Sequence, residues 1–171
     1  MYIFKYLGPA GAARVLEHED SLSIRFGLPR SYNDPYELFL QPSTPLASEE
    51  LRAFFEFLFG RVVQAPVSCF SVRPECVPMW AHYAQEGTGI VLGFDEDALA
   101  TEFSLAYFTD VEYSDAPATI DSNVIDWTFT TGKRGHASRL LAHAHRAAFF
   151  IKRLEWQYER TSTCRCNRRG V

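Results

Sequence analysis

The longest regular pattern in the chain is a stripe of apolar residues at helical spacing near the C-terminal end. It predicts one long helix from Arg134 to about Glu159. The stripe consists of Leu140, Ala144, Ala147, Ile151, Leu154 and Tyr158. A helix of this length needs a broad apolar surface to pack against, whereas the rest of the 171 residues offers only short patterns. This combination favours an α+β fold.

Short strand and helix patterns alternate through the remainder of the chain. Alternating or continuous apolar runs predict strands at residues 2–6, 22–26, 66–72, 89–94 and 106–113. Helical spacing and capping residues predict helices at residues 10–18, 48–59, 77–84 and 95–103. Gly60 is expected to end the second of these helices. Prolines and Asx residues predict a loop at 27–35, and 114–132 is predicted to be an irregular polar connection.

These elements predict a single α+β domain at residues 1–160. In it, a small central mixed sheet is flanked by helices and closed by the long C-terminal helix. Residues 161–171 have no apolar periodicity, so we expect a disordered basic tail there.

Charge is distributed very unevenly along the chain. Residues 1–132 carry a net charge of −12, whereas residues 133–171 carry +8. The basic end predicts either docking on the chain's own acidic part or an acidic protein or nucleic-acid partner held by the C-terminal helix. His136 and His143 lie seven residues apart on that helix, a spacing that permits phosphate contacts together with Arg139 and Arg146. A solvated basic face explains the same residues.

The composition excludes several protein classes. The four cysteines are few and irregularly spaced, so we expect free thiols and neither a disulfide framework nor a metal site. The N-terminus lacks the apolar core of a signal peptide, and no apolar run approaches the roughly 20 residues of a membrane span. A cytoplasmic protein without a membrane partner is therefore expected.

Four short stretches together carry a resemblance to a known family. They are Phe4 to Tyr6, the NDPYE segment at 33–37, CFS at 69–71 with MWAHYA and GTGIVLGFD at 79–95, and Lys152 with WQYE at 156–159. In order and separation they resemble a bacterial family known as domain of unknown function 2971. That family's ending is similar to W, two residues, E, one residue, E, one residue, R. Here Thr161 and Thr163 stand at the last two of these positions, so the pattern breaks after Glu159, as in a chain cut short or frame-shifted there.

The order of a basic residue, a strand serine and a late ExE pair is similar to that of the Arg-Ser-Glu class of ADP-ribosyltransferases. That resemblance implies that Lys5, with Tyr6 beside it, contacts the phosphates of NAD, and that Ser71 supports the nicotinamide pocket. Glu159 aligns with the first carboxylate of the pair. Thr161 replaces the second, which carries the catalytic role in that class, so this copy is expected to be weak or inactive. NAD would be a substrate, and no cofactor is required.

Other polar residues could complete such a pocket. Asn33 and Asp34 could line it, although Asx turns before a proline explain them equally simply. His82 is a candidate proton donor or ligand contact, with Tyr83 next to it, although a core histidine bonded to backbone fits as well.

Three functions stay open on the sequence alone. The first is a degenerate ADP-ribosyltransferase-like domain that binds NAD or a related nucleotide. The second is a non-catalytic interaction module of a phage-defence or toxin-associated pair. The third is a nucleic-acid-processing enzyme in which Asp34, Glu37 and His82 converge. Loss of a strand after Trp156 and Tyr158 would leave an open sheet edge, which predicts a homodimer.

Overall fold

Backbone contacts divide the chain into two compact units, each assembled from separate stretches of sequence. The computed structural model describes residues 1–17, 21–28, 40–104, 106–160 and 163–167. The first unit contains residues 1–27, 66–111 and 155–171, and the second contains residues 28–65 and 112–154. The prediction of one domain over residues 1–160 stays a prediction, and each unit is described here by itself.

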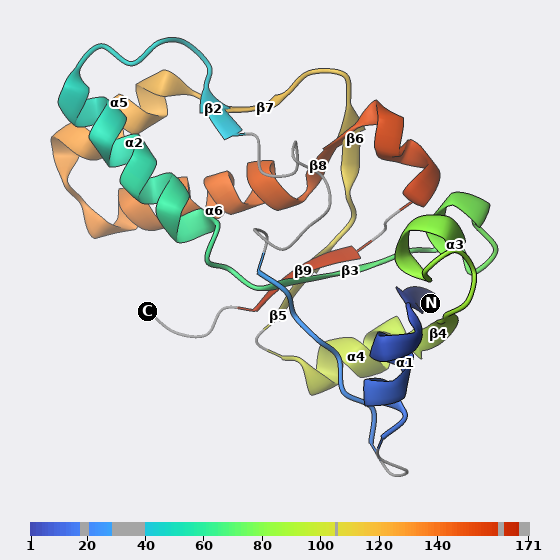
Figure 1. Cartoon of the computed structure of the whole chain (residues 1–171). Helices are drawn as coiled ribbons and strands as arrows, with labels where there is room; N and C mark the ends of the chain where they lie inside the picture. The colour runs from blue at the N-terminus through green and yellow to red at the C-terminus, as the bar shows by residue number, and fades with distance from the viewer. Residues whose placement is uncertain (18–20, 29–39, 105, 161–162, 168–171) are drawn as a thin grey trace. The chain divides into compact units, whose positions relative to one another are not determined.

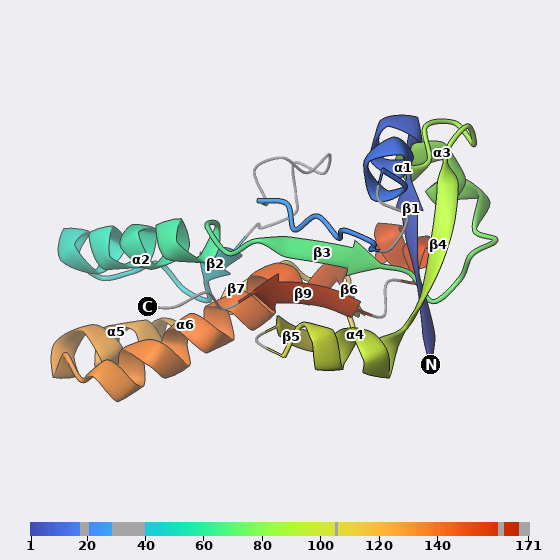
Figure 2. The ribbon, with the colours of Figure 1, turned by 90° about the horizontal axis from the view of Figure 1, so that it is seen from below.

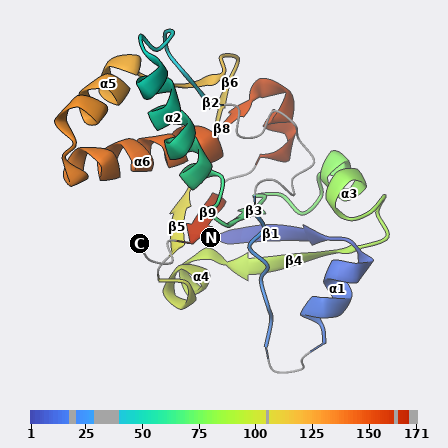
Figure 3. The ribbon, with the colours of Figure 1, turned by 60° about the vertical axis from the view of Figure 1, so that its left-hand side comes forward.

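Short antiparallel sheets organise the first unit. Strand β1 (Tyr2–Leu7) pairs with β4 (Ile90–Asp95), and the two lie side by side in Figure 3. Strand β9 (Thr163–Asn167) lies between β3 (Val67–Phe70) and β5 (Ala106–Thr109), and Figure 2 shows β3 and β9 next to each other. A single bridge between Phe4 and Ser71 joins β1 to the end of β3. Two sequence-distant segments are therefore held together where the predicted site residues lie.

Short helices cover these strands. They are α1 (Pro9–Val15), α3 (Val77–Tyr83), α4 (Glu96–Glu102) and a 3₁₀ helix, Leu154–Glu159. All residues of the 3₁₀ helix except Leu154 belong to this unit. Ile3, Phe70 and Leu99 form a buried cluster, with Phe94 packed edge-on against Phe70. Apolar burial of this kind is the main source of stability for such strands.

Helices dominate the second unit. Helices α2 (Glu49–Val62), α5 (Ser122–Thr131) and α6 (Arg134–Phe149) pack against one another, as Figure 1 shows. Two parallel strand pairs accompany them, β2 (Leu40–Pro42) with β7 (Ala118–Ile120), and β6 (Glu112–Ser114) with β8 (Ile151–Arg153). The mixed α and β content and the small sheets agree with the predicted class. The strands among the described residues form several small sheets, however, and not one central sheet.

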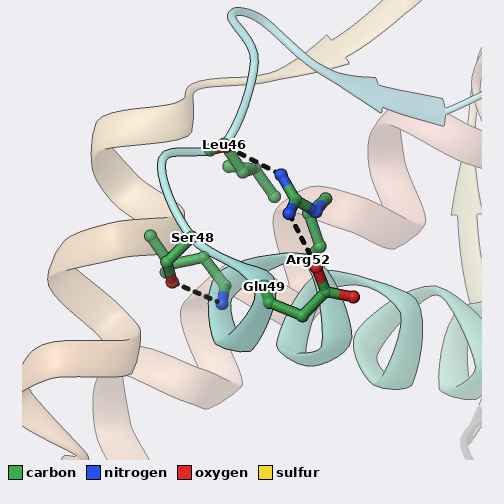
Figure 4. A network of polar contacts seen from close by, with 5 residues as sticks. Leu46, Ser48, Glu49 and Arg52 are labelled. Atoms are coloured by element: carbon green, nitrogen blue, oxygen red, sulfur yellow. Dashed lines mark hydrogen bonds and ion pairs between the residues drawn. The ribbon is translucent and has the colours of Figure 1, made fainter.

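The N-terminus of α2 is capped as the sequence predicts. The Ser48 hydroxyl accepts a hydrogen bond from the backbone N–H of Leu51 at 3.2 Å, and Arg52 forms an ion pair with Glu49 at 2.8 Å (Figure 4). The pKa of Glu50 is lowered, first because its carboxylate accepts a hydrogen bond from its own backbone N–H and then because the Ser48 side chain hydrogen-bonds to it. Because the pKa is lowered, the stabilisation that the folded state gains from the charged Glu50 carboxylate is present above the ordinary pKa of glutamate. This stabilisation is lost as the pH falls.

Removing the cap is expected to weaken this helix. We expect Ser48→Ala to lower the free energy of unfolding by about 1 kcal/mol, because the Leu51 N–H loses its acceptor. The same substitution is expected to move the pKa of Glu50 back toward its ordinary value. Urea denaturation and an NMR titration of the glutamate carboxyls measure the two effects. Ser48→Thr, which keeps the hydroxyl, is the control, and equal losses in both variants would contradict the capping role.

Several predicted boundaries are wrong, and each error has a local physical reason. Residues 22–26 form no strand, since Leu22 is 54% exposed and only Gly27 pairs, with Val67. Helix α2 runs through Gly60 to Val62, because glycine weakens a helix without having to end it. Helix α6 ends at Phe149, where pairing of the next residues with β6 replaces the helical pattern.

Two segments predicted to be irregular contain regular structure. Residues 114–132 include β7 and α5. Helix α5 begins after its N-cap, Asp121, and ends at Gly132, which has the left-handed conformation with φ 59°. Thr residues in α5 concealed it, because they have low helix propensity. The tail predicted to be disordered contains β9, whose backbone pairing on both sides requires no apolar periodicity.

Candidate functional site

The end of β3 and the end of the 3₁₀ helix meet at Ser71 and Glu159. Both residues are buried, with 0% of Ser71 and 1% of Glu159 exposed. The Ser71 hydroxyl donates a hydrogen bond to the backbone carbonyl of Glu159 at 2.8 Å and accepts one from the N–H of Arg73 at 3.2 Å. The backbone around Ser71 is fixed as well, through two hydrogen bonds with Phe4 at 2.7 and 2.8 Å. Ser71 therefore helps to hold the backbone of Glu159 in place and has no contact with solvent.

A tyrosine on α3 reaches the Glu159 carboxylate. The hydroxyl of Tyr83 donates a hydrogen bond to Oε1 of Glu159 at 2.6 Å. A hydrogen bond to a carboxylate is shorter and stronger than one between neutral groups. Tyr83 is 36% exposed, so this one side chain has its hydroxyl on a buried carboxylate while part of its surface faces solvent.

His82 lies beside this pair but on the surface. Its side chain is exposed, and its ring centroid lies 6.4 Å from that of Tyr83 and 6.3 Å from that of Tyr158. The structure thus brings His82, Tyr83 and Glu159 together with Ser71, although 76 positions of sequence separate Tyr83 from Glu159. We call these four residues the Glu159 cluster.

The ammonium of Lys5 is bound within the first unit. It donates hydrogen bonds to the hydroxyl of Ser68 at 2.8 Å and to the carbonyl of Cys69 at 2.9 Å, and it lies 5.2 Å from the centre of the Phe70 ring. Ser68 is a buried polar residue that the sequence did not single out. Strand alternation could have revealed it, because Ser68 and Phe70 share one face of β3. These contacts link Lys5 to β3, the same strand that leads to Ser71.

Tyr6 belongs to the interior of the unit. Its ring is 6% exposed and packs edge-on against Trp80, with ring centroids 5.5 Å apart. The hydroxyl donates to the Arg73 carbonyl at 2.6 Å and accepts from the Cys76 N–H at 3.2 Å. Burial raises the pKa of Tyr6, and the bond from Cys76 opposes that change. Its position is that of an anchor between β1 and the segment before α3.

The remaining predictions concern residues elsewhere. Asn33, Asp34 and Glu37 lie outside the described residues, so the proposed convergence of Asp34 and Glu37 with His82 stays a prediction. Cys69 and Cys76 are free thiols. In the described part of the chain, no group of three or more His, Cys, Asp or Glu side chains could hold a metal ion. None of the helices described has the length and apolar character needed to cross a membrane.

A family model matches the stretch of the chain that contains three of the four residues of the Glu159 cluster. A family model for a protein of unknown function (DUF2971) matches residues 79–160, a stretch that begins in α3 and includes His82, Tyr83 and Glu159. Neither the curated proteins nor the solved structures gave a significant match. The match covers the MWAHYA, GTGIVLGFD and WQYE segments that carry the resemblance in the sequence. Residues 79–160 of the chain therefore match the DUF2971 family of proteins of unknown function.

Proposed function

We propose that the chain is a degenerate ADP-ribosyltransferase-like domain that binds NAD or a related nucleotide without turning it over. The observation that carries this proposal is the 2.6 Å hydrogen bond from Tyr83 to the buried carboxylate of Glu159. The partly exposed side chain of Tyr83, held by a buried carboxylate, offers a flat surface for a base or nicotinamide ring. The exposed imidazole of His82 supplies a further polar contact at the same place.

The chemistry of NAD explains why a carboxylate matters in such a pocket. Breaking the bond between nicotinamide and ribose develops positive charge on the sugar, and a nearby carboxylate stabilises that charge. Glu159 matches the first position of the ExE pair in the resemblance described above, and Thr161 replaces the second, catalytic one. A domain with only the first carboxylate is suited to hold the ligand and lacks the group that accelerates its cleavage.

Ser71 and Lys5 support this pocket as positioning residues. Ser71 holds the backbone of Glu159 through its carbonyl. Lys5 ties β1 to β3 through Ser68 and Cys69, and the Phe4 to Ser71 bridge continues the same connection. Contacts from β1 and β3 thereby hold the backbone next to the Glu159 carboxylate in place.

Calorimetric titration with NAD and with ADP-ribose tests the proposal. We expect the chain to bind at least one of them, and we expect Tyr83→Ala to weaken that binding about tenfold, which corresponds to about 1.4 kcal/mol. Tyr2→Ala is the matched control, because Tyr2 is an exposed tyrosine of the same unit and is 64% exposed. We expect no release of nicotinamide over the same period.

Two results would contradict the proposal. One is the absence of binding to both ligands by a protein that circular dichroism shows to be folded. The other is an equal loss of affinity in Tyr2→Ala and Tyr83→Ala, because nonspecific contact with exposed aromatic rings would then explain the binding.

A further inference from the structure

A hollow lies within the second unit. It has a volume of about 400 Å³ and is lined by α5, α6 and the end of β7. Its apolar lining residues include Ile120, Val124 and Leu140. The rim is formed by Trp127, His136, Arg139 and His143. Ligand sites combine an apolar surface with a few polar groups in this way, and the volume is within their usual range.

The rim is rich in groups that bind anions. His136, Arg139 and His143 occupy positions three and seven residues apart on α6, so they lie on one face of the helix. Within the described chain, Arg139 has no ion-pair partner. The carboxylate that lines the hollow, Asp121, caps α5 by accepting hydrogen bonds from the backbone and side-chain nitrogens of Asn123 at 2.9 and 3.1 Å.

The ring of His136 is fixed in orientation. It stacks on Trp127 with centroids 3.7 Å apart and an angle of 22° between the planes. Its Nδ1 atom lies 2.9 Å from the Thr131 hydroxyl, which donates its hydrogen to the carbonyl of Trp127 at 2.8 Å. Because that hydrogen is used, Nδ1 of His136 must be the donor in the contact with Thr131. Nε2 is then the ring atom left for a ligand, and it donates to an anion only when the ring is protonated.

The indole of Trp127 lies against this ring and also lines the hollow. Trp127 is itself 52% exposed, which leaves part of its surface open to a ligand. The exposed part of Trp127 and Nε2 of His136 are therefore both available to a ligand at the rim.

We propose that this hollow binds a small phosphate ester that carries a flat ring. The phosphate contacts Arg139 and protonated His136, with His143 at the edge. The ring lies against Leu140 and Trp127. The phosphate supplies a negative charge for Arg139, and the ring covers apolar lining of the hollow. The site belongs to the second unit and does not depend on nucleotide binding at the Glu159 cluster.

Titration with adenosine monophosphate, inorganic phosphate and adenosine tests this site in the full chain. We expect the monophosphate to bind more tightly than either fragment, because only it uses both the rim and the apolar lining. Arg139→Gln is expected to weaken its binding at least tenfold. Arg134→Gln is the matched control, since Arg134 is an exposed arginine of the same helix that does not line the hollow.

Three results would overturn the inference. They are the absence of monophosphate binding, equal losses in Arg134→Gln and Arg139→Gln, and equal affinities for inorganic phosphate and the monophosphate. Equal losses would indicate a diffuse basic face. Glu159→Gln is expected to leave monophosphate binding at this hollow unchanged, so failure here and failure at the Glu159 cluster are separate results.

Discussion

Replacing Gly89 with alanine is expected to lower the free energy of unfolding by about 3 kcal/mol. A Cβ atom at this position would overlap the backbone carbonyl of Leu7 and would lie 3.0 Å from the carbonyl oxygen of Ala84. Leu7 pairs with Ile90 in the β1 to β4 ladder, so its carbonyl cannot retreat without disturbing the sheet. The N–H of Gly89 also donates to Ala84 at 2.8 Å and closes the turn after α3. Urea denaturation followed by circular dichroism measures the loss.

Gly87 provides the matched control in the same turn. Its backbone has φ of +82°, a conformation that favours glycine, but nothing lies within 4 Å of a Cβ placed there. Gly87→Ala is therefore expected to cost only about 1 kcal/mol through backbone strain. A larger loss for Gly87→Ala than for Gly89→Ala would mean that conformation, and not the close approach of β1, determines the need for glycine in this turn.

The contrast between these glycines shows what a sequence pattern can predict. Residues 89–94 predict a buried strand bounded by glycine, and the structure has β4 at Ile90–Asp95, whose residues are partly or fully exposed. The pattern identifies a boundary at Gly89 because glycine commonly interrupts regular structure. The reason for this glycine, the backbone of Leu7, lies more than 80 positions earlier and depends on tertiary pairing. The local sequence was therefore sufficient to predict strand β4 and insufficient to predict the contact between Gly89 and Leu7.

The same limit applies to the end of the predicted long helix. Leu154 and Tyr158 continue the helical stripe of α6, yet the chain leaves the helix after Phe149. Residues 151–153 instead pair in parallel with β6, and the N–H of Glu112 donates to the carbonyl of Phe150 at 2.8 Å. Apolar periodicity records which side chains are buried and does not distinguish helix packing from pairing with a distant strand.

The sequence selected individual candidate residues and could not specify the contacts between them. Chain order and resemblance selected Ser71, Tyr83 and Glu159 as separate candidates. The structure adds that Ser71 contacts the backbone of Glu159 and that Tyr83 contacts its carboxylate. Those bonds join residues 88 and 76 positions apart, which no local pattern specifies. Trp127 was missed altogether, since the segment that contains it was expected to be irregular.

Replacing Tyr83 with phenylalanine is expected to lower the free energy of unfolding by about 2 kcal/mol. The substitution keeps the ring and removes the hydroxyl that donates to Oε1 of Glu159. A buried carboxylate oxygen that loses a donor bears the cost of its desolvation, and Glu159 is only 1% exposed. Tyr2→Phe removes a hydroxyl from a tyrosine that is 64% exposed, so we expect a change within about 0.5 kcal/mol there.

A double-mutant cycle with Glu159→Gln separates this bond from the other contacts of both residues. If the bond accounts for the loss, Tyr83→Phe costs much less in the Glu159→Gln background than in the original chain, and the coupling is about 1 to 2 kcal/mol. Urea denaturation of the four proteins gives the coupling directly. Additive losses would instead mean that Tyr83 stabilises α3 through its ring alone. The carboxylate of Glu159 would then be held by its other partners, and the half-exposed tyrosine would lose its role as the link between the buried acid and a ligand.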